Sequence, residues 1–535
     1  MAAGDPFYIT TPIFYVNDVP HIGHAYTEVA ADVLARWHRQ AGDDTWLLTG
    51  TDEHGQKILR TAVANDTTPK EWADRLVAEA WVPLLNTVDI ANDDFIRTTD
   101  ERHESGVLAF LTKLYDDGFI YSGEYEGYYC VGCEEYKQLD DLMEAPEGEL
   151  AGQLVCKIHG RPVEVLQETN YFFRMSQFEQ RLLDLYESRP DFIQPESVRN
   201  EIIQFVRQGL QDLSISRSSF DWGIQIPWDE RHVLYVWFDA LLNYTTAVGY
   251  GVDAAQFARR WPAVHIVGKD IARFHAVIWP AMLMAAGLPV PSRVFGHGWL
   301  LVGGEKMSKS KLTGIAPHQI TDTFGSDAFR YYFMRAISFG QDGSFSWEDL
   351  SARYQAELAN GFGNLASRVT AMIGRYFDGV LPAPAEPGEA ELAIQRTVAD
   401  AASRADAAIE RFAIHEAVAA VWTIVDELNG YITAEEPWVL AKDPAARERL
   451  GTVLYTAAEG LRALAVLLSP VIPRATAKLW AALGAEGALA EQPLREAGAW
   501  GVLAPGAAVS RLEALFPRIE QSTEQEGAQP ESVPA

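Results

Sequence analysis

The first third of the chain alternates between strand-like and helix-like hydrophobic patterns. Residues 7–10 are β-branched or aromatic and lie between prolines, which predicts a buried strand. From Ile22 the apolar residues recur with a helical period, and Gly42 marks its end. Three further elements are predicted here: a strand at Thr45–Thr51 and helices at Pro69–Asn86 and Glu101–Asp117. This order is typical of an α/β fold with a parallel sheet.

The pattern changes between Gly118 and Asp221. This segment is rich in Tyr, Gly and Cys and contains an acidic loop and short strand-like runs, as an insertion would. Longer strand-like runs return at Val233–Phe238, Val264–Val267 and Arg293–Phe295, and the first and third continue into helical patterns. We therefore expect a parallel sheet that is interrupted by an inserted module.

Strand signals almost vanish after Ser351, where Ala, Leu, Glu and Arg dominate. Five helical periods follow, at Tyr354–Phe377, Glu389–Arg411, Ile414–Ala434, Ala445–Leu468 and Arg474–Leu483. They predict an α-helical bundle. The final stretch, Glu520–Ala535, has no aromatic residue and is predicted to be a disordered tail.

Composition narrows the functional classes. The chain has 535 residues, of which 48% are hydrophobic and 22% charged, as in ordinary globular proteins. A net charge of −30 argues against non-specific binding of nucleic acid by the whole surface, although a local basic patch could still bind RNA. The first twenty residues lack Lys and Arg, no apolar run is long enough to span a bilayer, and three cysteines are too few for a disulfide framework. We expect a cytoplasmic protein without a membrane segment.

Two short motifs, far apart in the sequence, suit a nucleoside triphosphate. His21-Ile22-Gly23-His24 falls at the predicted start of a helix just after a strand, where backbone N–H groups and the helix dipole favour phosphate. The segment Lys306-Met307-Ser308-Lys309-Ser310 is cationic and could stabilise departing pyrophosphate. We expect both motifs to line one nucleotide cleft.

The cysteines form a second pattern. Cys130-x₂-Cys133 and Cys156-x₂-His159 use every cysteine of the chain. Two such pairs can close a tetrahedral Zn²⁺ site, and a full set of four ligands leaves no open position. The spacing therefore predicts one structural zinc site.

The two phosphate motifs in this order resemble those of class I aminoacyl-tRNA synthetases. Over about residues 5–515 the chain is most similar to the methionyl-tRNA synthetases. Five further segments carry this likeness: Thr11–Tyr15, Gly50–Gly55, Val236–Ala240, Gly268–Asp270 with Phe274-His275, and Gly363–Arg368. The resemblance implies a Rossmann-like parallel-sheet α/β catalytic domain that is split by a zinc-knuckle insertion and followed by an all-α anticodon-binding bundle.

The resemblance also implies domain boundaries. The expected segments are a first catalytic half at 1–117, the insertion at 118–221, a second catalytic half at 222–297, a lysine-loop and stem-contact region at 298–350, the anticodon-binding domain at 351–516 and an acidic tail at 517–535.

The implied reaction joins methionine to ATP as methionyl-adenylate and then transfers the methionyl group to the terminal ribose of tRNA. The amino-acid carboxylate attacks the α-phosphate, so positioning and charge stabilisation suffice. Mg²⁺ would accompany ATP. The catalytic residues implied are His21, His24, Lys306 and Lys309, and the further ATP-binding residues are Gly23, Gly268, Asp270 and Ser308.

A methionine pocket is implied as well. A thioether is apolar and makes favourable contacts with aromatic rings. The positions that match the family's pocket are Ile13, Tyr15, Asp52, Trp237, Ala240, Leu241, Tyr244, Ile271, His275 and Trp279. Asp52 would bind the substrate ammonium group with Arg217 as its charge partner. Periodicity alone would place the aromatic residues in the core, and some relatives have proline in place of Leu241.

Asn364, Arg368 and Trp438 match the family's anticodon-binding residues. An amide, a guanidinium and an indole suit bases in RNA loops, which are read by stacking and by hydrogen bonds. Trp438 follows Pro437, so it should begin a helix and could be exposed; packing between helices is the alternative. The expected partners are ATP, L-methionine and both initiator and elongator tRNA(Met), and the chain is expected to be a monomer.

Other functional classes fit less well. Synthetases for leucine, isoleucine or valine normally carry a larger editing insertion than 118–221 could provide. A small-molecule nucleotidyltransferase would have no use for the helical bundle. A non-catalytic tRNA-binding relative would be expected to have lost part of the phosphate motifs, which are intact. A zinc hydrolase is disfavoured because no His-Glu-x-x-His pattern occurs.

Overall fold

The computed structural model describes residues 4–133, 135–137, 139–145, 150–158, 160–302, 305–306 and 314–519. The predicted tail at Glu520–Ala535 lies outside this range. The chain divides into two compact units, each described by itself below. Unit 1 comprises Met1–Pro317 and Ser338–Ser344, and unit 2 comprises His318–Ile337 and Phe345–Ala535.

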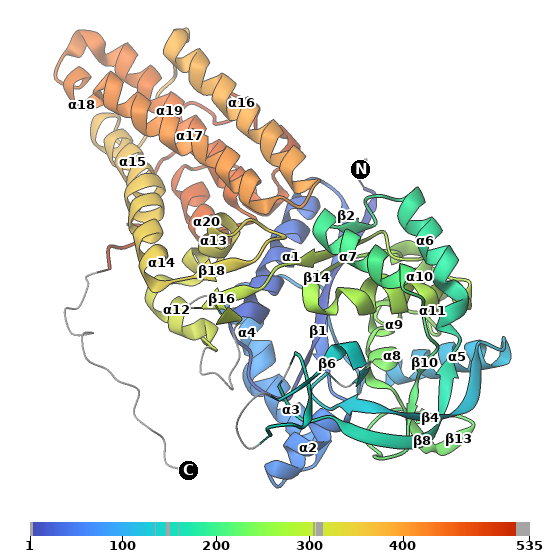
Figure 1. Ribbon diagram of the computed structural model, residues 1–535. Coiled ribbons are helices and arrows are strands. Elements are labelled where there is room, and N and C mark those ends of the chain that lie inside the picture. The colour runs from blue at the N-terminus through green and yellow to red at the C-terminus, as the bar shows by residue number, and fades with distance from the viewer. Residues whose placement is uncertain are drawn as a thin grey trace. The chain divides into compact units, whose positions relative to one another are not determined.

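A six-stranded parallel sheet forms the centre of unit 1 (Figure 1). Its strands, in spatial order, are β3 (Asp94–Arg97), β2 (Asp44–Asp52), β1 (Pro6–Tyr15), β14 (Ala263–Gly268), β15 (Arg293–His297) and β9 (Ile193–Gln194). The chain leaves β1 for β2 on one side and returns as β14 on the other. In such open sheets ligands bind beyond the carboxyl ends of the strands at this switch point.

Helices cover both faces of the sheet because their apolar faces must be buried. Helix α1 (Ile22–Gln40) is buried at most of its positions, as its helical period predicted. The others of this unit are α2 (Gln56–Ala64), α3 (Pro69–Leu76), α4 (Val82–Thr87), α5 (Glu101–Asp116), α6 (Glu179–Ser188), α7 (Glu196–Arg207), α8 (Val236–Ala240), α9 (Asn243–Thr246), α10 (Ala254–Arg260) and α11 (Trp279–Ala286). A π-helical turn, Val77–Trp81, joins α3 to α4.

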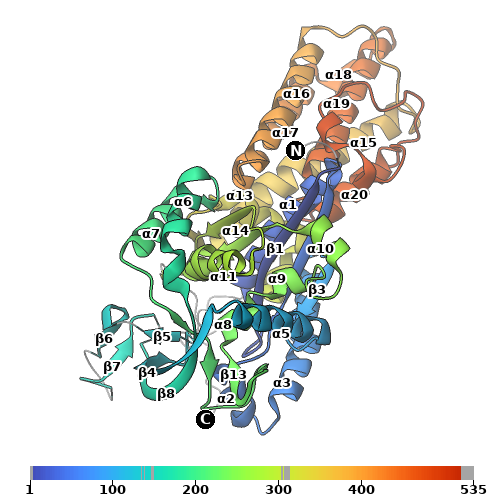
Figure 2. The ribbon, with the colours of Figure 1, turned by 90° about the vertical axis from the view of Figure 1, so that its right-hand side faces the viewer.

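Apart from β9, which belongs to the parallel sheet, the strands between Ile120 and Leu234 form small antiparallel sheets. Strands β4 (Ile120–Cys130) and β8 (Glu164–Phe173) pair along their length, and β5, β6 and β7 lie towards the far end of this ribbon (Figure 2). The shorter strands are β5 (Glu135–Lys137), β6 (Leu142–Glu144), β7 (Leu154–Cys156), β10 (Leu213–Ser214), β11 (Ser216–Arg217), β12 (Gln225–Ile226) and β13 (Asp229–Leu234). The prediction of an insertion within a parallel sheet is confirmed.

Two predicted elements were wrong in detail. The run Val233–Phe238 is not one strand of the parallel sheet: β13 ends at Leu234 within the antiparallel sheet β11-β13-β12, and α8 follows. All these residues except Trp237 are buried, so the run has no polar alternation that could separate strand from helix. After Arg293–Phe295 comes a hairpin, β16 (Leu300–Val302) with β17 (Glu305–Lys306), rather than a helix.

Unit 2 is a helical bundle, as the sequence predicted. Its elements are α12 (Pro317–Phe324), α13 (Ser326–Ala336), α14 (Trp347–Arg353), a π-helical segment (Tyr354–Gly363), α15 (Asn364–Tyr376), α16 (Glu389–Ile409), α17 (Ile414–Glu435), α18 (Pro437–Leu440), α19 (Arg447–Leu468) and α20 (Pro473–Ala482); β18 (Gly343–Phe345) joins the units. Asp327 of α13 accepts hydrogen bonds from the Arg474 and Ala475 N–H groups, which caps α20. Pro444–Leu468 is apolar and long enough to cross a membrane, but its apolar window is entirely buried in the bundle, as in a core helix.

Candidate active site

The start of α1 is shaped by its two histidines. The His21 Nδ1 accepts a hydrogen bond from the Gly23 N–H, and the His24 Nδ1 accepts one from the His21 N–H, each at 3.0 Å. The rings stack with centroids 3.8 Å apart. Because both Nδ1 atoms are acceptors, the ring proton of each uncharged imidazole lies on Nε2. The pair therefore combines a reciprocal helix cap with two N–H donors suited to phosphate oxygens.

The segment that follows the second phosphate motif returns to this helix. The Ile22 N–H, in the first turn of α1, donates a 2.9 Å hydrogen bond to the Ile315 carbonyl. The backbone of Lys306, the first residue of the motif, belongs to β17 and is paired there with β16. Met307, Ser308 and Lys309, like the side chain of Lys306, lie outside the described residues. The described residues on the two sides of the motif thus lie in a hairpin and, at Ile315, next to the first turn of α1.

The ends of β14 and β15 form the neighbouring wall. A side chain at Gly268 would place its Cβ 2.5 Å from a carboxylate oxygen of Asp270, so the Asp270 side chain could not keep this position beside any other residue. The His297 Nε2 accepts a 2.8 Å hydrogen bond from the Thr27 hydroxyl of α1, and its Nδ1 donates to the Gly298 carbonyl. Burial lowers the pKa of His297, although the Asp270 carboxylate opposes the shift. Gly268 and Asp270 therefore lie close to α1, the helix that carries His24 and is capped by His21.

A buried polar pair lies at the floor of the predicted methionine pocket. The Tyr244 hydroxyl donates to the His275 Nε2 at 2.7 Å, and the His275 Nδ1 donates to the Ile271 carbonyl at 3.0 Å. Burial lowers the pKa of His275 to about 4, so the ring is neutral at pH 7. Burial also raises the pKa of Tyr244, and the Asp52 carboxylate adds to that shift. The floor of the pocket is uncharged, with Asp52 close by.

Aromatic rings form the walls. Trp237 stacks on Phe274 with centroids 3.8 Å apart and meets Tyr15 edge-on at 6.2 Å. Tyr15 and Asp52 are register partners at the ends of β1 and β2. Ala240, Leu241, Tyr244 and Trp279 are buried, while Ile13, Tyr15, Trp237 and Ile271 are partly buried. The residues predicted to bind methionine thus lie on β1, β2, α8, α9 and the segment 271–279, around one end of the sheet.

Arg217 is almost fully buried. Its Nη1 donates to the Ser216 carbonyl at 2.7 Å, and its guanidinium lies over the rings of Tyr129 and Tyr235. Tyr235 precedes α8, so Arg217 supports the helix that carries Trp237. Its predicted role as the charge partner of Asp52 stays a prediction.

Three cysteine thiols lie close together near Trp237. The sulfur atoms of Cys130, Cys133 and Cys156 lie within 4.8 Å of one another and could hold a metal ion. Hydrogen bonding with Cys130 and Cys156, and then burial, raises the pKa of the Cys133 thiol, an effect that a bound cation would reverse. The predicted fourth ligand, His159, lies outside the described residues. The Trp237 indole N–H donates to the Cys133 carbonyl at 3.4 Å, which links the cysteine cluster to the pocket.

The predicted anticodon residues lie on unit 2. Asn364 and Arg368 are one turn apart on α15, and Asn364 is exposed. The Arg368 guanidinium lies 5.7 Å from the ring of Trp438, which is 36% exposed at the start of α18. The helix start predicted at Pro437 is confirmed. The structure therefore brings Arg368 and Trp438 together on a solvent-accessible face.

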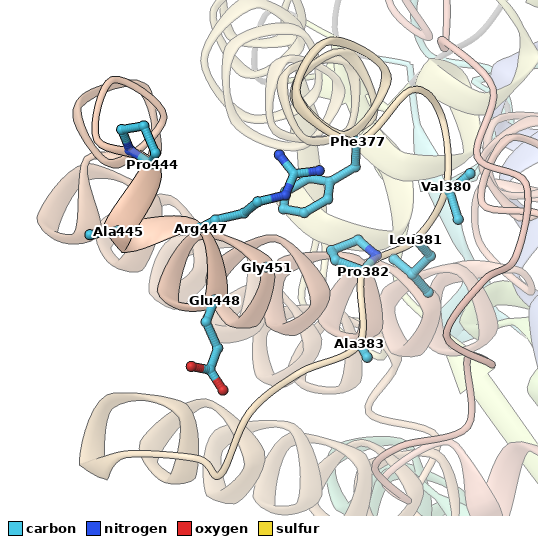
Figure 3. A pocket seen from close by; sticks show the side chains of 10 residues that line it. All are labelled: Phe377, Val380, Leu381, Pro382, Ala383, Pro444, Ala445, Arg447, Glu448 and Gly451. Atoms are coloured by element: carbon cyan, nitrogen blue, oxygen red, sulfur yellow. The ribbon is translucent and has the colours of Figure 1, made fainter.

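A hollow of about 720 Å³ lies further along the same unit. Figure 3 shows it between the end of α15 and the start of α19, with the Arg447 side chain laid over Phe377. Its lining also includes Leu381, Pro382 and Glu448. The hollow is thus lined by both apolar and charged side chains, and no site residue predicted from the sequence lies in it.

Several residues that build the site were not predicted. His265 donates from Nδ1 to Thr10 and accepts at Nε2 from the Trp279 indole, at 2.8 and 3.2 Å. Tyr8 donates to the Tyr244 carbonyl at 2.8 Å. A histidine inside the apolar run Val264–Val267 was a usable signal, because a buried imidazole needs partners. Tyr8 gave no such signal, since an aromatic residue is ordinary in a buried strand.

The geometry can now be compared with known proteins. Residues 7–370 match the family described as tRNA synthetases class I (M), and residues 381–530 match the anticodon binding domain of methionyl tRNA ligase. The methionine–tRNA ligase of Streptomyces coelicolor is 60% identical over 96% of this chain and 97% of its own length. That of Caldanaerobacter subterraneus is 48% identical over 97% of this chain and 80% of its own.

A solved structure agrees. The methionyl-tRNA synthetase of Mycobacterium tuberculosis in complex with methionyl-adenylate is 40% identical, with a TM-score of 0.92, and the match covers 96% of this chain and all of that one. Both family matches and both relatives lead to one group. The chain belongs to the class I methionyl-tRNA synthetases.

Proposed function

We propose that the chain attaches L-methionine to tRNA(Met) at the expense of ATP, through methionyl-adenylate, with release of pyrophosphate and AMP. The observation that supports the proposal is the hydrogen bond from the Ile22 N–H to the Ile315 carbonyl, which holds a segment that follows the lysine motif in the sequence against the first turn of α1. Two cationic or donor groups from distant parts of the sequence would then face one polyphosphate. The family membership and the adenylate bound by the Mycobacterium relative support the same reaction.

The nucleotide would lie over the carboxyl ends of β1, β14 and β15. His21 and His24 donate Nε2–H groups to ATP phosphates, with Gly23 leaving room for them. Asp270 accepts from the ribose hydroxyls, and Gly268 leaves room for the Asp270 carboxylate in its present position. Lys306, Ser308 and Lys309 stabilise the pyrophosphate as it leaves. Mg²⁺ enters with ATP as part of the substrate.

Methionine would place its thioether against Trp237 and the Tyr244–His275 pair. The neutral His275 suits an uncharged sulfur, since an imidazolium would be strongly desolvated there. Asp52 binds the ammonium group and leaves the carboxylate directed at the α-phosphate. The remaining lining residues are Ile13, Tyr15, Ala240, Leu241, Ile271 and Trp279. The chain supplies orientation and charge stabilisation, and no protein nucleophile is needed.

Zinc suits the three thiols, and His159 would complete the site. When bound, the metal would hold the knuckle folded. The anticodon loop would contact Asn364, Arg368 and Trp438, in both initiator and elongator tRNA(Met). We further propose that the chain acts in the cytoplasm as a monomer.

Exchange of labelled phosphate between pyrophosphate and ATP tests the proposed reaction directly. Methionine should support exchange, and leucine, isoleucine and valine should not. Exchange with one of these three instead of methionine would contradict the substrate. Absence of exchange with all four would favour a binding protein.

Metal analysis tests the knuckle separately. The protein as expressed should contain about one zinc per chain. Cys133→Ser should lose the metal, whereas the exposed substitution Ser188→Ala should keep it. Full zinc retention by Cys133→Ser would contradict the site.

A further inference from the structure

A second buried network lies behind the pocket, outside the residues assigned above. Asp239 of α8 is fully buried, and each of its carboxylate oxygens accepts a hydrogen bond from an imidazole. The His54 Nδ1 donates to Oδ2 and the His103 Nε2 donates to Oδ1, both at 2.7 Å. The His103 Nδ1 lies 2.8 Å from the Thr246 hydroxyl of α9. One carboxylate therefore joins the β2 loop, α5, α8 and α9.

The residues it joins flank the predicted methionine contacts. His54 is two residues after Asp52, on the loop that follows β2. Asp239 lies between Trp237 and Ala240 on α8. The network thus ties the carboxylate proposed for the ammonium group to the helix proposed for the thioether. Any change in its length would alter the distance between the two ends of the methionine site.

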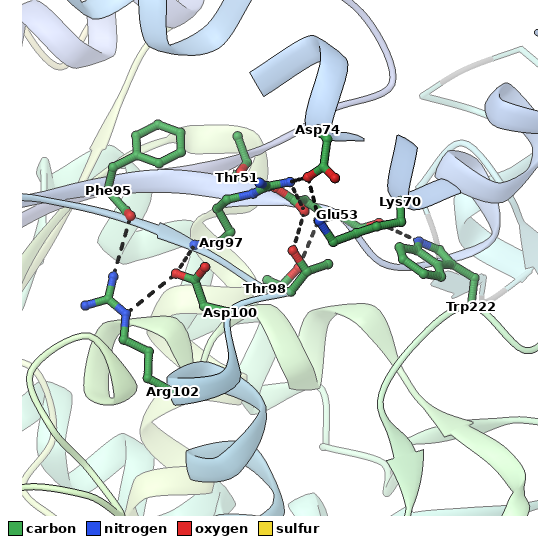
Figure 4. A network of polar contacts seen from close by, with 11 residues as sticks. Thr51, Glu53, Lys70, Asp74, Phe95, Arg97, Thr98, Asp100, Arg102 and Trp222 are labelled. Atoms are coloured by element: carbon green, nitrogen blue, oxygen red, sulfur yellow. Dashed lines mark hydrogen bonds and ion pairs between the residues drawn. The ribbon is translucent and has the colours of Figure 1, made fainter. Parts of the chain in front are cut away.

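The loop that carries His54 is also fixed from its other side. Arg97 donates to both oxygens of Glu53 at 2.6 and 2.9 Å, and the Thr98 hydroxyl accepts from the Glu53 N–H at 2.9 Å (Figure 4). The Trp222 indole donates to the Glu53 carbonyl at 2.6 Å. Glu53 and His54, the two residues directly after Asp52, are therefore both held. The loop is therefore tied by hydrogen bonds on both sides.

Electrostatics favour the same arrangement. Burial disfavours a charged His54, but attraction to Asp239 outweighs it and the pKa of His54 is raised. Burial would raise the pKa of Asp239, but both histidines stabilise its charge and the net shift is downward. Glu53 and Glu104 also stabilise a charged His54. The carboxylate is thus kept ionised inside the unit, where partial loss of its partners is costly.

We propose that Asp239, held by His54 and His103, is a positioning residue that sets the geometry of the methionine site without touching the substrate. This inference rests on the proposed function, since it concerns how that site takes up methionine. The network would control the binding of methionine and would have no effect on the binding of ATP. The nucleotide side is built separately, from α1 and the ends of β14 and β15.

The test is the effect of Asp239→Asn on methionine-dependent exchange. Asparagine keeps the shape, but its amide NH₂ must face one of the imidazole N–H donors. We expect the KM for methionine to rise at least about tenfold, because a buried donor loses its acceptor, while the KM for ATP changes less than about twofold.

The chain supplies a matched control. His38 and Asp43 form another buried pair, with 2.7 Å between His38 Nδ1 and Asp43 Oδ2, near the opposite end of β2. Asp43→Asn should destabilise the fold comparably and leave both KM values unchanged. Equal changes in the two variants, or a parallel rise in the KM for ATP, would overturn the positioning role.

A second pair of variants covers the case in which Asp239→Asn does not fold. His54→Asn keeps a donor close to the position of Nδ1, whereas His54→Ala removes it. We expect His54→Ala to raise the KM for methionine and His54→Asn to restore most of it; equal values would contradict the proposal. If the unaltered protein shows no methionine-dependent exchange, the proposed function fails and not this inference alone.

Discussion

The proposed methionine pocket and the proposed anticodon face are built in opposite ways. In the pocket, Tyr244 and His275 are buried and joined by a 2.7 Å hydrogen bond. On the helical unit, Asn364 is exposed, and the Arg368 guanidinium lies 5.7 Å from the ring of Trp438, which is partly exposed. A small ligand with one sulfur atom gives few contacts, so its site must be formed in advance. An RNA loop brings many bases, and exposed stacking surfaces suffice.

The comparison predicts that adenylate formation and tRNA charging can be separated by mutation. The largest effect is expected at the phosphate end of the cleft. Lys309→Ala should slow adenylate formation by roughly 10²–10³-fold, because a charge that stabilises the leaving pyrophosphate is lost. Single-turnover kinetics would measure this, and the Kd for methionine should stay nearly unchanged.

The control for this substitution is Lys113→Ala on α5, which removes an exposed lysine that forms an ion pair with Asp117. It should not affect the rate. A loss in Lys309→Ala that appears mainly as weaker methionine binding would refute the assigned role.

The next effect belongs to the anticodon face. Trp438→Ala should lower kcat/KM for tRNA by roughly 5- to 100-fold, the range expected for the loss of base stacking. Exchange with methionine should be unaffected. Trp438→Phe retains an aromatic surface and should recover much of the loss. If Trp438→Ala impaired exchange equally, the side chain would act in packing.

A smaller effect is expected at the floor of the pocket. Tyr244→Phe removes the hydroxyl that donates to the His275 Nε2, so this buried nitrogen loses its hydrogen-bond donor. The KM for methionine should rise by about 10-fold, with the KM for ATP unchanged. Steady-state exchange at varied methionine measures this change. An equal rise for ATP would show that the two halves of the site are not independent.

The smallest effect concerns pH. Burial lowers the pKa of His275 to about 4, compared with about 6.5 in an unfolded chain. Between these values the unfolded state binds more protons, so the free energy of unfolding falls as the pH falls. From pH 6.5 to 5.5 this histidine should cost about 1 kcal/mol. Urea unfolding of the unaltered protein and of His275→Gln should differ by that amount; identical pH dependence would contradict a neutral, buried ring.

The same contrast explains how far the sequence could predict the structure. Helix α1 and the long helices of the bundle follow from hydrophobic periodicity, which is local. The prediction of one strand at Val233–Phe238 was wrong because burial on all sides leaves no periodicity to distinguish a strand from a helix. The residues proposed for the anticodon, Asn364 and Arg368, are one turn apart and could be placed on a common helix face from spacing alone.

The candidate site was predicted from motifs, whereas its geometry could not be predicted from the sequence. The segments that carry His54 and Asp239 were both recognised in the sequence, yet their contact joins positions 185 residues apart. No local pattern encodes such a pairing. The orientation of the His21 and His24 rings was equally hidden, because it depends on which backbone N–H each Nδ1 accepts.

The central claim is that the imidazole pair and the lysine motif act on one polyphosphate. A double-mutant cycle on single-turnover adenylate formation tests it. His21→Asn retains a capping acceptor and removes Nε2, and it would be combined with Lys309→Ala. We predict that the combined loss differs from the product of the single losses by at least about fivefold, as expected for groups that share a partner. Losses that multiply to within about twofold would contradict a shared polyphosphate.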